Sequence, residues 1–309
     1  MDLVFLGTGS GMPTSTRALP SIAIRWGSEV LILDCGEGMQ YRYLRIGFGV
    51  NKEMKILISH LHGDHYFGLF GFLQTLALSG RTRELLVIGP EGIAEIMDTI
   101  LKRSQASSKS HSERGYRLLI KELKNEVEVL DFGRYCVKAV RVEHSITTYA
   151  FAIEEKELPG TFHPERARAL GVPVRYWKLL QSGQSVVLPN GIVVHPRDVC
   201  DEPRRGLKLV YSGDTRPCEK LIKLAKGADI LIHEATFMDR DRDKAIESMH
   251  STAREAAWVA KEAGVRSLIL FHISPRYTEQ EGHLLKEAEE EFSNVYLPKD
   301  MDWIKIDHE

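Results

Sequence analysis

The sequence of 309 residues has no apolar run that approaches the roughly 18 residues of a membrane-spanning helix. Its first residues lead at once into the apolar segment LVFLG, without the basic region and cleavage site of a signal peptide. Cysteine is scarce, and Cys35, Cys136, Cys200 and Cys218 form no CxxC pair, which argues against a zinc knuckle or a disulfide framework. We therefore expect a soluble, cytoplasmic protein without membrane contact, in which the four thiols are buried.

An excess of charge of one sign is also missing. The 41 Lys and Arg residues are balanced by 43 Asp and Glu residues, for a formal net charge of −2. This balance excludes a protein coated in positive potential, which is the usual form of a nucleic-acid binder. Any contact with nucleic acid would have to be local. Hydrophobic residues make up 43% of the chain, which is enough for a sizeable buried core.

Apolar runs and turn-forming residues predict the order of the elements. Short apolar runs separated by Gly, Ser and Pro predict successive strands, at residues 3–6, 22–25 and 30–33. From Met54 the pattern changes to strand followed by helix, and this alternation resumes beyond Lys208. Between Ser145 and Arg205 the sequence shows no regular period. The order predicts an α/β fold in two halves around an irregular insertion.

The segment ISHLHGDH carries four potential metal ligands, His60, His62, Asp64 and His65, between an apolar strand pattern and a helix. His60 and His62 could point one way from an extended loop, whereas Asp64 and His65 would turn toward a neighbouring position. Imidazole nitrogen suits zinc, and a carboxylate can ligate a metal or orient a water molecule. The segment therefore predicts a catalytic site for two adjacent cations rather than a solvent-exposed, histidine-rich loop.

Three further candidate ligands, His144, Asp214 and His272, each follow a predicted strand. Because binding sites in open α/β sheets gather outside the carboxyl ends of the strands, these residues can converge with the HLHGDH loop. Each has an ordinary alternative. Asp214 could begin the turn into the next helix, and His144 or His272 could be a hydrogen-bonded core histidine.

The HxHxDH arrangement, followed by a later His, Asp and His at strand ends, resembles the metallo-β-lactamase fold. The resemblance implies a four-layer αβ/βα sandwich with two zinc ions per subunit. It assigns one zinc to His60, His62, His144 and Asp214, and the other to Asp64, His65, Asp214 and His272. Two zinc ions about 3.5–4 Å apart can hold a hydroxide and neutralise charge on a phosphoryl transition state. The motif specifies hydrolysis more strongly than it specifies the substrate.

Further segments narrow the resemblance to the short form of the ribonuclease Z family: FLGTGSGMPT, LDCGEG, HEATF, HST and HISPRY. They occur in order along almost the whole chain. The family resemblance implies a zinc-dependent endoribonuclease that removes the 3′ trailer from tRNA precursors. Cleavage after the discriminator nucleotide would leave a 3′-hydroxyl on the tRNA and a 5′-phosphate on the trailer. It also implies precursor tRNA as the partner and a homodimer.

Two other functions remain as alternatives. A phosphodiesterase of the same fold that acts on a small molecule would share the metal ligands but would need no RNA-sized arm. A catalytically silent RNA-binding protein could keep the fold, but a binding module has no physical reason to retain seven ligands.

His250 is the candidate general acid. It precedes Thr252 and Glu255, whose spacing predicts a capping box for the next helix. In the family it pairs with the Glu of the HEAT segment, which is Glu234 here. A carboxylate that hydrogen-bonds a histidine favours its protonated form, so we predict that His250 protonates the departing O3′. Asp64 would accept the proton of the attacking water.

Candidate substrate contacts lie in two motifs. Ser274 and Arg276 in HISPRY offer donors to phosphate oxygens, although Arg276 could equally be a surface ion-pair partner. Arg17 is retained from the family's loop after the first strand, where this chain reads PTSTRA and lacks the Lys and Asn. The response to a CCA sequence is therefore open. Asp34 in LDCGEG could orient a ligating histidine or pin a turn.

The resemblance makes residues 1–309 a single metallo-β-lactamase domain with an inserted arm at about 155–205 that binds the tRNA elbow. Positive charge could be concentrated in this arm, with Tyr176 and Trp177 between its basic residues. Such contacts to phosphates give affinity and register without reading the base sequence. The alternative is a surface hairpin that caps the active site or packs on a partner subunit, with Trp177 at the interface.

Overall fold

The computed structural model describes residues 1–103 and 115–307. The chain divides into two compact units. The first unit comprises Met1–Leu130, Val137–Ile153 and Lys208–Glu309, and the second comprises Asp131–Cys136 and Glu154–Leu207. The segment that we interpreted as an arm lies in the second unit.

Six strands from residues 2–123 and one strand from residues 303–305 form a seven-stranded sheet. In spatial order its strands are β16 (Trp303–Lys305), β1 (Asp2–Gly7), β2 (Ser21–Trp26), β3 (Glu29–Leu33), β4 (Glu53–Leu57), β5 (Leu85–Pro90) and β6 (Leu118–Leu123). Strands β16, β1, β2 and β3 pair antiparallel, whereas β3 to β6 pair parallel. Short connections in the antiparallel part therefore give way to strand–helix units, as the sequence pattern predicted.

Seven strands between residues 127 and 296 form another sheet. In spatial order its strands are β15 (Val295–Tyr296), β14 (Ser267–Phe271), β13 (Ile230–Glu234), β12 (Lys208–Tyr211), β9 (Thr148–Glu155), β8 (Tyr135–Val142) and β7 (Val127–Asp131). Strands β12 to β15 pair parallel, so their carboxyl ends lie at one edge.

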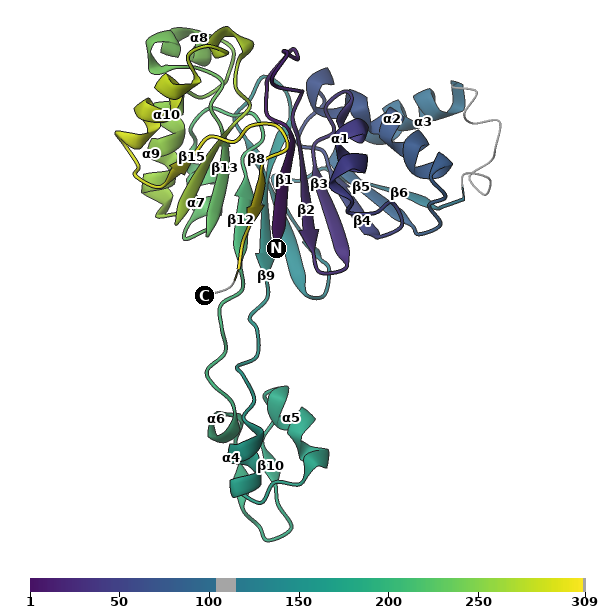
Figure 1. The fold of residues 1–309 in the computed structure, drawn as a ribbon, viewed down its shortest axis with the longest axis vertical. Coiled ribbons are helices and arrows are strands. Elements are labelled where there is room, and N and C mark those ends of the chain that lie inside the picture. The colour runs from purple at the N-terminus through teal and green to yellow at the C-terminus, as the bar shows by residue number, and fades with distance from the viewer. Residues whose placement is uncertain (104–114, 308–309) are drawn as a thin grey trace. The chain divides into compact units, whose positions relative to one another are not determined.

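Helices cover the outer face of each sheet (Figure 1). On the first sheet these are α1 (Met39–Ile46), α2 (Gly63–Leu78) and α3 (Ile93–Arg103). On the second sheet they are α7 (Glu219–Ala225), α8 (Arg242–Glu247), α9 (Ala253–Ala263) and α10 (Glu281–Glu289), with the 3-10 turns η3 (Asp239–Asp241) and η4 (Pro275–Tyr277). The helix–sheet–sheet–helix order confirms the predicted four-layer αβ/βα sandwich.

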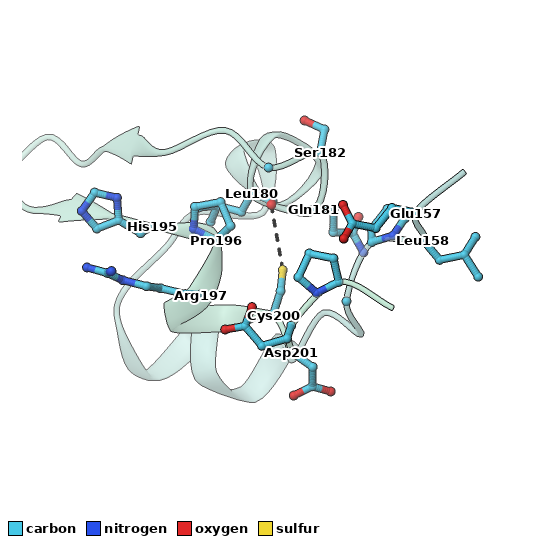
Figure 2. A pocket seen from close by; sticks show the side chains of 15 residues that line it. Glu157, Leu158, Leu180, Gln181, Ser182, His195, Pro196, Arg197, Cys200 and Asp201 are labelled. Carbon is cyan, nitrogen blue, oxygen red and sulfur yellow. Dashed lines mark hydrogen bonds between the residues drawn. The ribbon is translucent and has the colours of Figure 1, made fainter. Parts of the chain in front are cut away.

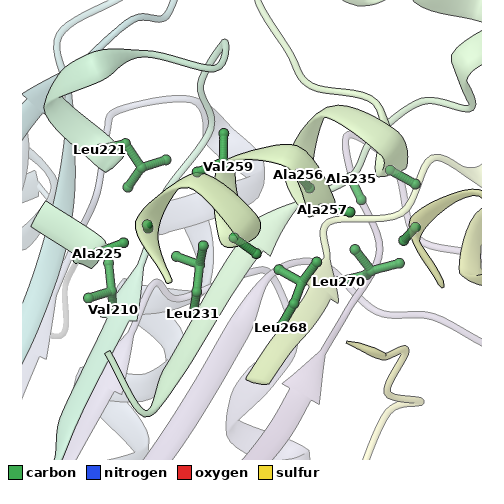
Figure 3. Close-up of a cluster of buried hydrophobic side chains, with 14 of the residues drawn as sticks. Val210, Leu221, Ala225, Leu231, Ala235, Ala256, Ala257, Val259, Leu268 and Leu270 are labelled. Carbon is green, nitrogen blue, oxygen red and sulfur yellow. The ribbon is translucent and has the colours of Figure 1, made fainter. Parts of the chain in front are cut away.

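The core of the second half depends on small side chains. Helix α9 turns a row of alanines, including Ala256 and Ala257, toward Leu231 on β13 and Leu268 on β14 (Figure 3). Alanine favours the helix and lets it approach the sheet closely. The helix ends at Gly264, whose φ of 60° is the left-handed conformation that closes many helices.

The structure corrects the predicted loss of regularity after Ser145. Residues 148–155 form β9, whose first six residues are all buried. A strand with both faces covered shows no alternation of apolar and polar residues, so its signal was weak.

The second unit is not irregular throughout either. It contains α4 (Pro164–Ala169), η2 (Val174–Tyr176), α5 (Trp177–Gln181), β10 (Val186–Val187), β11 (Val193–Val194) and α6 (Pro196–Val199). Their apolar side chains form a separate small core, which includes Ala167, Leu180 and Val199. Elements of this length are too short to produce a periodic pattern.

Within the described residues, no helix is long and apolar enough to cross a membrane. All four cysteines are free thiols; Cys35, Cys200 and Cys218 are buried, and Cys136 is partly exposed.

Candidate metal centre

The HLHGDH segment runs from the loop after β4 into the first turn of α2, so helix formation sets part of its geometry. His60 is fully buried in the extended part of the loop. His62 is the N-cap residue of α2, with extended backbone angles of −76° and 141°. Asp64 and His65 therefore lie in the first helical turn, where an acidic side chain is favoured by the helix dipole. The change from extended to helical backbone falls between the two pairs, which belong to two different groups of candidate ligands.

The remaining candidate ligands follow strands of the second sheet and converge on this loop. His144 follows β8, Asp214 follows β12, and His272 follows β14. Ligand atoms of the first group lie within 4.8 Å of one another: His60, His62, His144 and Asp214. The second group, Asp64, His65 and His272, satisfies the same limit.

Asp214 lies between the two groups. Its Oδ2 is 3.2 Å from His65 Nε2, 3.4 Å from His272 Nε2 and 3.5 Å from His60 Nε2. Its Oδ1 is buried and accepts no hydrogen bond from the described residues. A buried carboxylate oxygen without a partner is costly, so this position suits a cation.

In four of the five candidate histidines the outer nitrogen already has a hydrogen-bond partner. These pairs are His60 Nδ1 with Ser59 Oγ at 2.9 Å, His65 Nδ1 with Asp34 Oδ2 at 2.7 Å, His144 Nδ1 with Met249 O at 2.8 Å, and His272 Nδ1 with Thr236 Oγ1 at 2.8 Å. Where the outer nitrogen donates its proton, as His144 does to the Met249 carbonyl, the inner nitrogen presents a lone pair.

The inner nitrogens face one another. His65 Nε2 is 3.1 Å from His272 Nε2, and His60 Nε2 is 3.1 Å from His62 Nδ1. Two lone pairs at this distance repel unless a cation or an additional proton lies between them. Together with the Asp214 carboxylate, this donor set fits a metal ion.

Three of the candidate histidines have protonation states that suit metal binding. Burial lowers the pKa of His60, His62 and His144, so these rings are neutral at pH 7. Burial opposes ionisation of Asp64, but hydrogen bonding to His272 and the charges of His65 and His272 lower its pKa. The Asp64 side chain is therefore a carboxylate, as a ligand or proton acceptor must be.

Asp34 connects several parts of the site. Its Oδ1 accepts a hydrogen bond from Ser59 N at 2.7 Å. Its Oδ2 accepts from His65 Nδ1 at 2.7 Å, Ser59 Oγ at 2.8 Å and Tyr211 Oη at 2.7 Å. Asp34 thus holds His65, a candidate ligand, and also pins the turn before His60.

Backbone strain is concentrated around the centre. Four non-glycine residues in the described ranges have positive φ, and three of them are Asp34 (56°), Met249 (59°) and His272 (60°). Left-handed backbone costs a non-glycine residue roughly 1–2 kcal/mol. The surrounding hydrogen bonds hold these residues in strained conformations that place their side chains or carbonyls at the site.

His250 and Glu234 form a hydrogen-bonded pair beside the ligands. Glu234 ends β13, and its Oε1 accepts from His250 Nδ1 at 2.8 Å. Burial would lower the pKa of His250, but the charge and hydrogen bond of Glu234 and the charge of Asp214 raise it to about 9. Because Nδ1 is engaged, Nε2 on the other side of the ring can face a substrate. The predicted capping box after His250 is confirmed, since Thr252 and Glu255 bond each other's backbone N–H.

Ser274 lies just before η4, and Arg276 lies within it. Ser274 Oγ caps this turn by accepting from Arg276 N at 3.4 Å. The exposed Arg276 guanidinium lies 5.6 Å from the centre of the Phe237 ring, which in turn is 6.2 Å from the His250 ring. Phe237 is therefore a common neighbour of the arginine and the candidate acid.

Arg17 is placed differently from our prediction. Its side chain is only 5% exposed, and its Nε and Nη2 donate to the Glu281 carboxylate. Its Nη1 donates to Thr8 Oγ1 and to Pro298 O. A guanidinium enclosed in this way has no free face for a substrate, so we correct its role to a structural one.

None of the predicted site residues lines the large cavity of about 530 Å³ in the second unit. Figure 2 shows His195 and Arg197 on one side of this cavity and Glu157 on the other. Cys200 Sγ donates a weak hydrogen bond to Leu180 O at 3.9 Å.

Charge in the second unit is segregated rather than uniformly positive. Residues 154–207 contain eight Lys or Arg and seven Asp or Glu, but residues 161–197 contain five and one. The excess of positive charge therefore lies in the middle of the segment. Trp177 packs on Phe162 and donates to Val172 O at 3.0 Å, so it belongs to the local core.

Fold and site together define a metal-dependent hydrolase of the metallo-β-lactamase fold. Residues 1–160 match the family model of the anti-Pycsar protein Apyc1, and residues 199–273 match that of the beta-lactamase superfamily domain. Ribonuclease Z of Myxococcus xanthus is 42% identical to this chain, and the match covers 94% of this chain and 93% of that protein. Ribonuclease Z of Methanosarcina mazei is 38% identical, and the match covers 97% of this chain and 96% of that protein. The crystal structure of human tRNase Z, short form, superposes with a TM-score of 0.71 at 27% identity, covering 99% of this chain and all of that one. The chain belongs to the ribonuclease Z family and is an endoribonuclease.

Proposed function

We propose that this chain removes the 3′ trailer from tRNA precursors, cutting after the discriminator nucleotide to leave a 3′-hydroxyl on the tRNA and a 5′-phosphate on the trailer. The observation that carries the proposal is the placement of the His250–Glu234 pair directly beside seven candidate metal ligands. Membership of the ribonuclease Z family supports tRNA as the substrate.

The metals in this proposal are two zinc ions per subunit. His60, His62, His144 and Asp214 would hold one, and Asp64, His65, Asp214 and His272 the other. The mixture of imidazole and carboxylate donors suits zinc. When bound, two zinc ions would supply an activated water and neutralise charge on the phosphate.

The two proton transfers are assigned to different residues. Glu234 holds His250 through Nδ1, so the Nε2 proton is available for the departing O3′. Asp64 is ionised, and its Oδ2 is held in place by Gly11 N at 2.8 Å. It accepts the proton of the attacking water. Ser274 and Arg276 donate to the scissile or a flanking phosphate.

The basic middle of the second unit, residues 161–197, is the part that we assign to the tRNA elbow. Replacing residues 161–197 by a short Gly-Ser linker should abolish tRNA binding while hydrolysis of a small phosphodiester survives. Equal loss of both activities would refute a role in binding alone. Reversing the charges of Arg166 and Arg168 should weaken tRNA binding most at low salt.

A homodimer in the cytoplasm completes the proposal. Large apolar side chains are exposed on the neighbouring helices α1 and α2, notably Tyr41 (71%) and Phe67 (57%). We expect sedimentation to give the mass of a dimer and Tyr41→Asp to shift it toward the monomer. A wild-type monomer at micromolar concentration would refute this part.

The test of the proposal is cleavage of a tRNA precursor that carries a 3′ trailer, with and without a chelator. We expect a product with a 3′-hydroxyl at the discriminator nucleotide only when metal is present. His144→Ala should abolish cleavage, whereas His283→Ala, at an exposed histidine of α10, should not. An intact precursor together with hydrolysis of a small phosphodiester would favour the small-molecule alternative.

A further inference from the structure

Arg216 lies two residues after Asp214 and reaches the loop that carries His250. Its side chain is only 15% exposed, and its partner Glu255 is 9% exposed. We propose that Arg216 is a positioning residue, which sets the proton donor His250 relative to Asp214 through the main chain of His250 and an ion pair with Glu255. This inference rests on the proposed role of His250.

The guanidinium of Arg216 bonds two parts of the same loop. Nη1 donates to the carbonyl oxygen of His250 and, at 2.8 Å, to Glu255 Oε2. Nη2 donates to Glu255 Oε1 at 2.5 Å. The two parallel bonds to Glu255 fix the plane of the guanidinium, and this plane determines where the His250 carbonyl lies.

Glu255 links this ion pair to the start of α9. Its Oε2 also accepts from Thr252 N at 3.0 Å in the capping box. The first residues of α9 are therefore held by the same carboxylate that holds Arg216. Since His250 is two residues before Thr252, it has little freedom to move while both contacts exist.

The main chain of residues 214–216 forms hydrogen bonds with three other segments that surround the site. Arg216 N donates to Glu143 O at 2.8 Å, next to the candidate ligand His144. Thr215 N donates to Glu234 Oε1 at 3.0 Å, the same oxygen that accepts from His250. Ser251 Oγ donates to Thr215 O at 2.6 Å. Arg216 thus completes a set of contacts that surround His250.

The strained residue Met249 explains why this loop needs an anchor. Its φ is 59°, and its carbonyl accepts from His144 Nδ1. Without the bond from Arg216 to the next carbonyl, Met249 can relax toward negative φ. That rotation would displace the His250 ring, and a displacement of about 1 Å can lower a rate about 100-fold.

The test compares Arg216→Met with Arg254→Met. Arg254 is an arginine of α9 that pairs with Asp239 and Glu290, outside the contacts of His250. Each variant is assayed in single-turnover cleavage of a tRNA precursor and of the same precursor with sulfur in place of the leaving O3′. A thiolate departs without protonation, so a defect in proton donation disappears with this substrate.

We expect Arg216→Met to lower the single-turnover rate on the oxygen substrate about 10–100-fold, with KM changed less than about threefold. With the sulfur substrate the rate should be within about threefold of wild type, as it should be for His250→Ala. Arg216→Met should bind as much zinc as the wild type. Arg216→Lys should recover part of the rate, and Arg254→Met should behave as wild type. Glu255→Gln keeps the helix cap and removes the charge, so it should lower the rate on the oxygen substrate less than Arg216→Met does and should also recover on the sulfur substrate. It replaces Arg216→Met in the experiment if Arg216→Met does not fold.

Three results would overturn the inference. One is that Arg216→Met lowers the single-turnover rate equally on both substrates, although the sulfur substrate restores the rate of His250→Ala. Another is a loss of zinc that accounts for the lower rate. The third is failure of the sulfur substrate to rescue His250→Ala, which removes the proposed role of His250 and with it this inference.

Discussion

Replacing Asp34 by Asn tests whether this carboxylate acts on the metal centre or only on the fold. Asn tolerates the left-handed backbone of position 34, where φ is 56°, so the substitution changes chemistry rather than backbone conformation. The carboxylate accepts four buried hydrogen bonds, one at Oδ1 and three at Oδ2. An amide has one oxygen and one NH₂ group, so it cannot accept all four.

The less harmful orientation of the amide keeps its oxygen at the position of Oδ2. The NH₂ group then opposes the N–H of Ser59, and one buried donor is left without an acceptor. This costs about 1–3 kcal/mol of unfolding free energy. The neutral amide is also a weaker acceptor for His65 Nδ1, and loss of such a partner typically weakens metal affinity about 10–100-fold.

The measurements are urea unfolding of the metal-free protein and zinc affinity by competition with a chelator. Asp229→Asn is the matched control, because Asp229 is 5% exposed and accepts from Lys208 N at 2.8 Å at the opposite end of β13 from the site. The control should lose stability without losing zinc affinity. If Asp34→Asn has the zinc affinity of the control, the carboxylate only pins the turn and our reasoning about His65 is wrong.

Three further predictions concern metal, core and loop. Chelation should abolish cleavage and lower the melting temperature, because the inward-facing histidine nitrogens and Asp214 Oδ1 lose the metal that they share. A melting temperature that does not rise when zinc is added back would contradict this. Leu231→Ala, in the core under α9, should lower the unfolding free energy by about 2–5 kcal/mol in urea titrations and leave the rate constant of the folded enzyme unchanged. Arg17→Met should destabilise the fold by about 1–3 kcal/mol, because it leaves Glu281 without its partner. Its KM for precursors with and without CCA should not change, and a changed KM would restore a substrate contact for this arginine.

Much of the candidate site could be predicted because its signals are local. His60, His62, Asp64 and His65 lie in six consecutive residues, and a strand followed by a helix is enough to separate them into two directions. The rule that sites lie at the carboxyl ends of strands brought in the ligands from the second sheet. Family motifs added His250 and Glu234, which the structure places 2.8 Å apart.

Other features could not be predicted because they depend on partners far apart in the chain. Arg17 is paired with a residue 264 positions away, and Tyr211 reaches Asp34 across 177 positions. No periodic pattern or short motif records such a pair. Strand β9 was missed for a related reason, since burial on both faces removes the alternation that marks a strand.

The sequence by itself determined the set of candidate donors, the alternation of strands and helices outside residues 145–205, and the kind of chemistry that imidazoles and carboxylates can perform. Only the tertiary structure decided which nitrogen of each histidine faces the centre, because that depends on the hydrogen bond made by the opposite nitrogen. It also decided that Arg17 is enclosed, while Arg276 is exposed beside Phe237. A side chain's identity fixes its chemistry, but packing between distant segments fixes which of its atoms a substrate or a metal can reach.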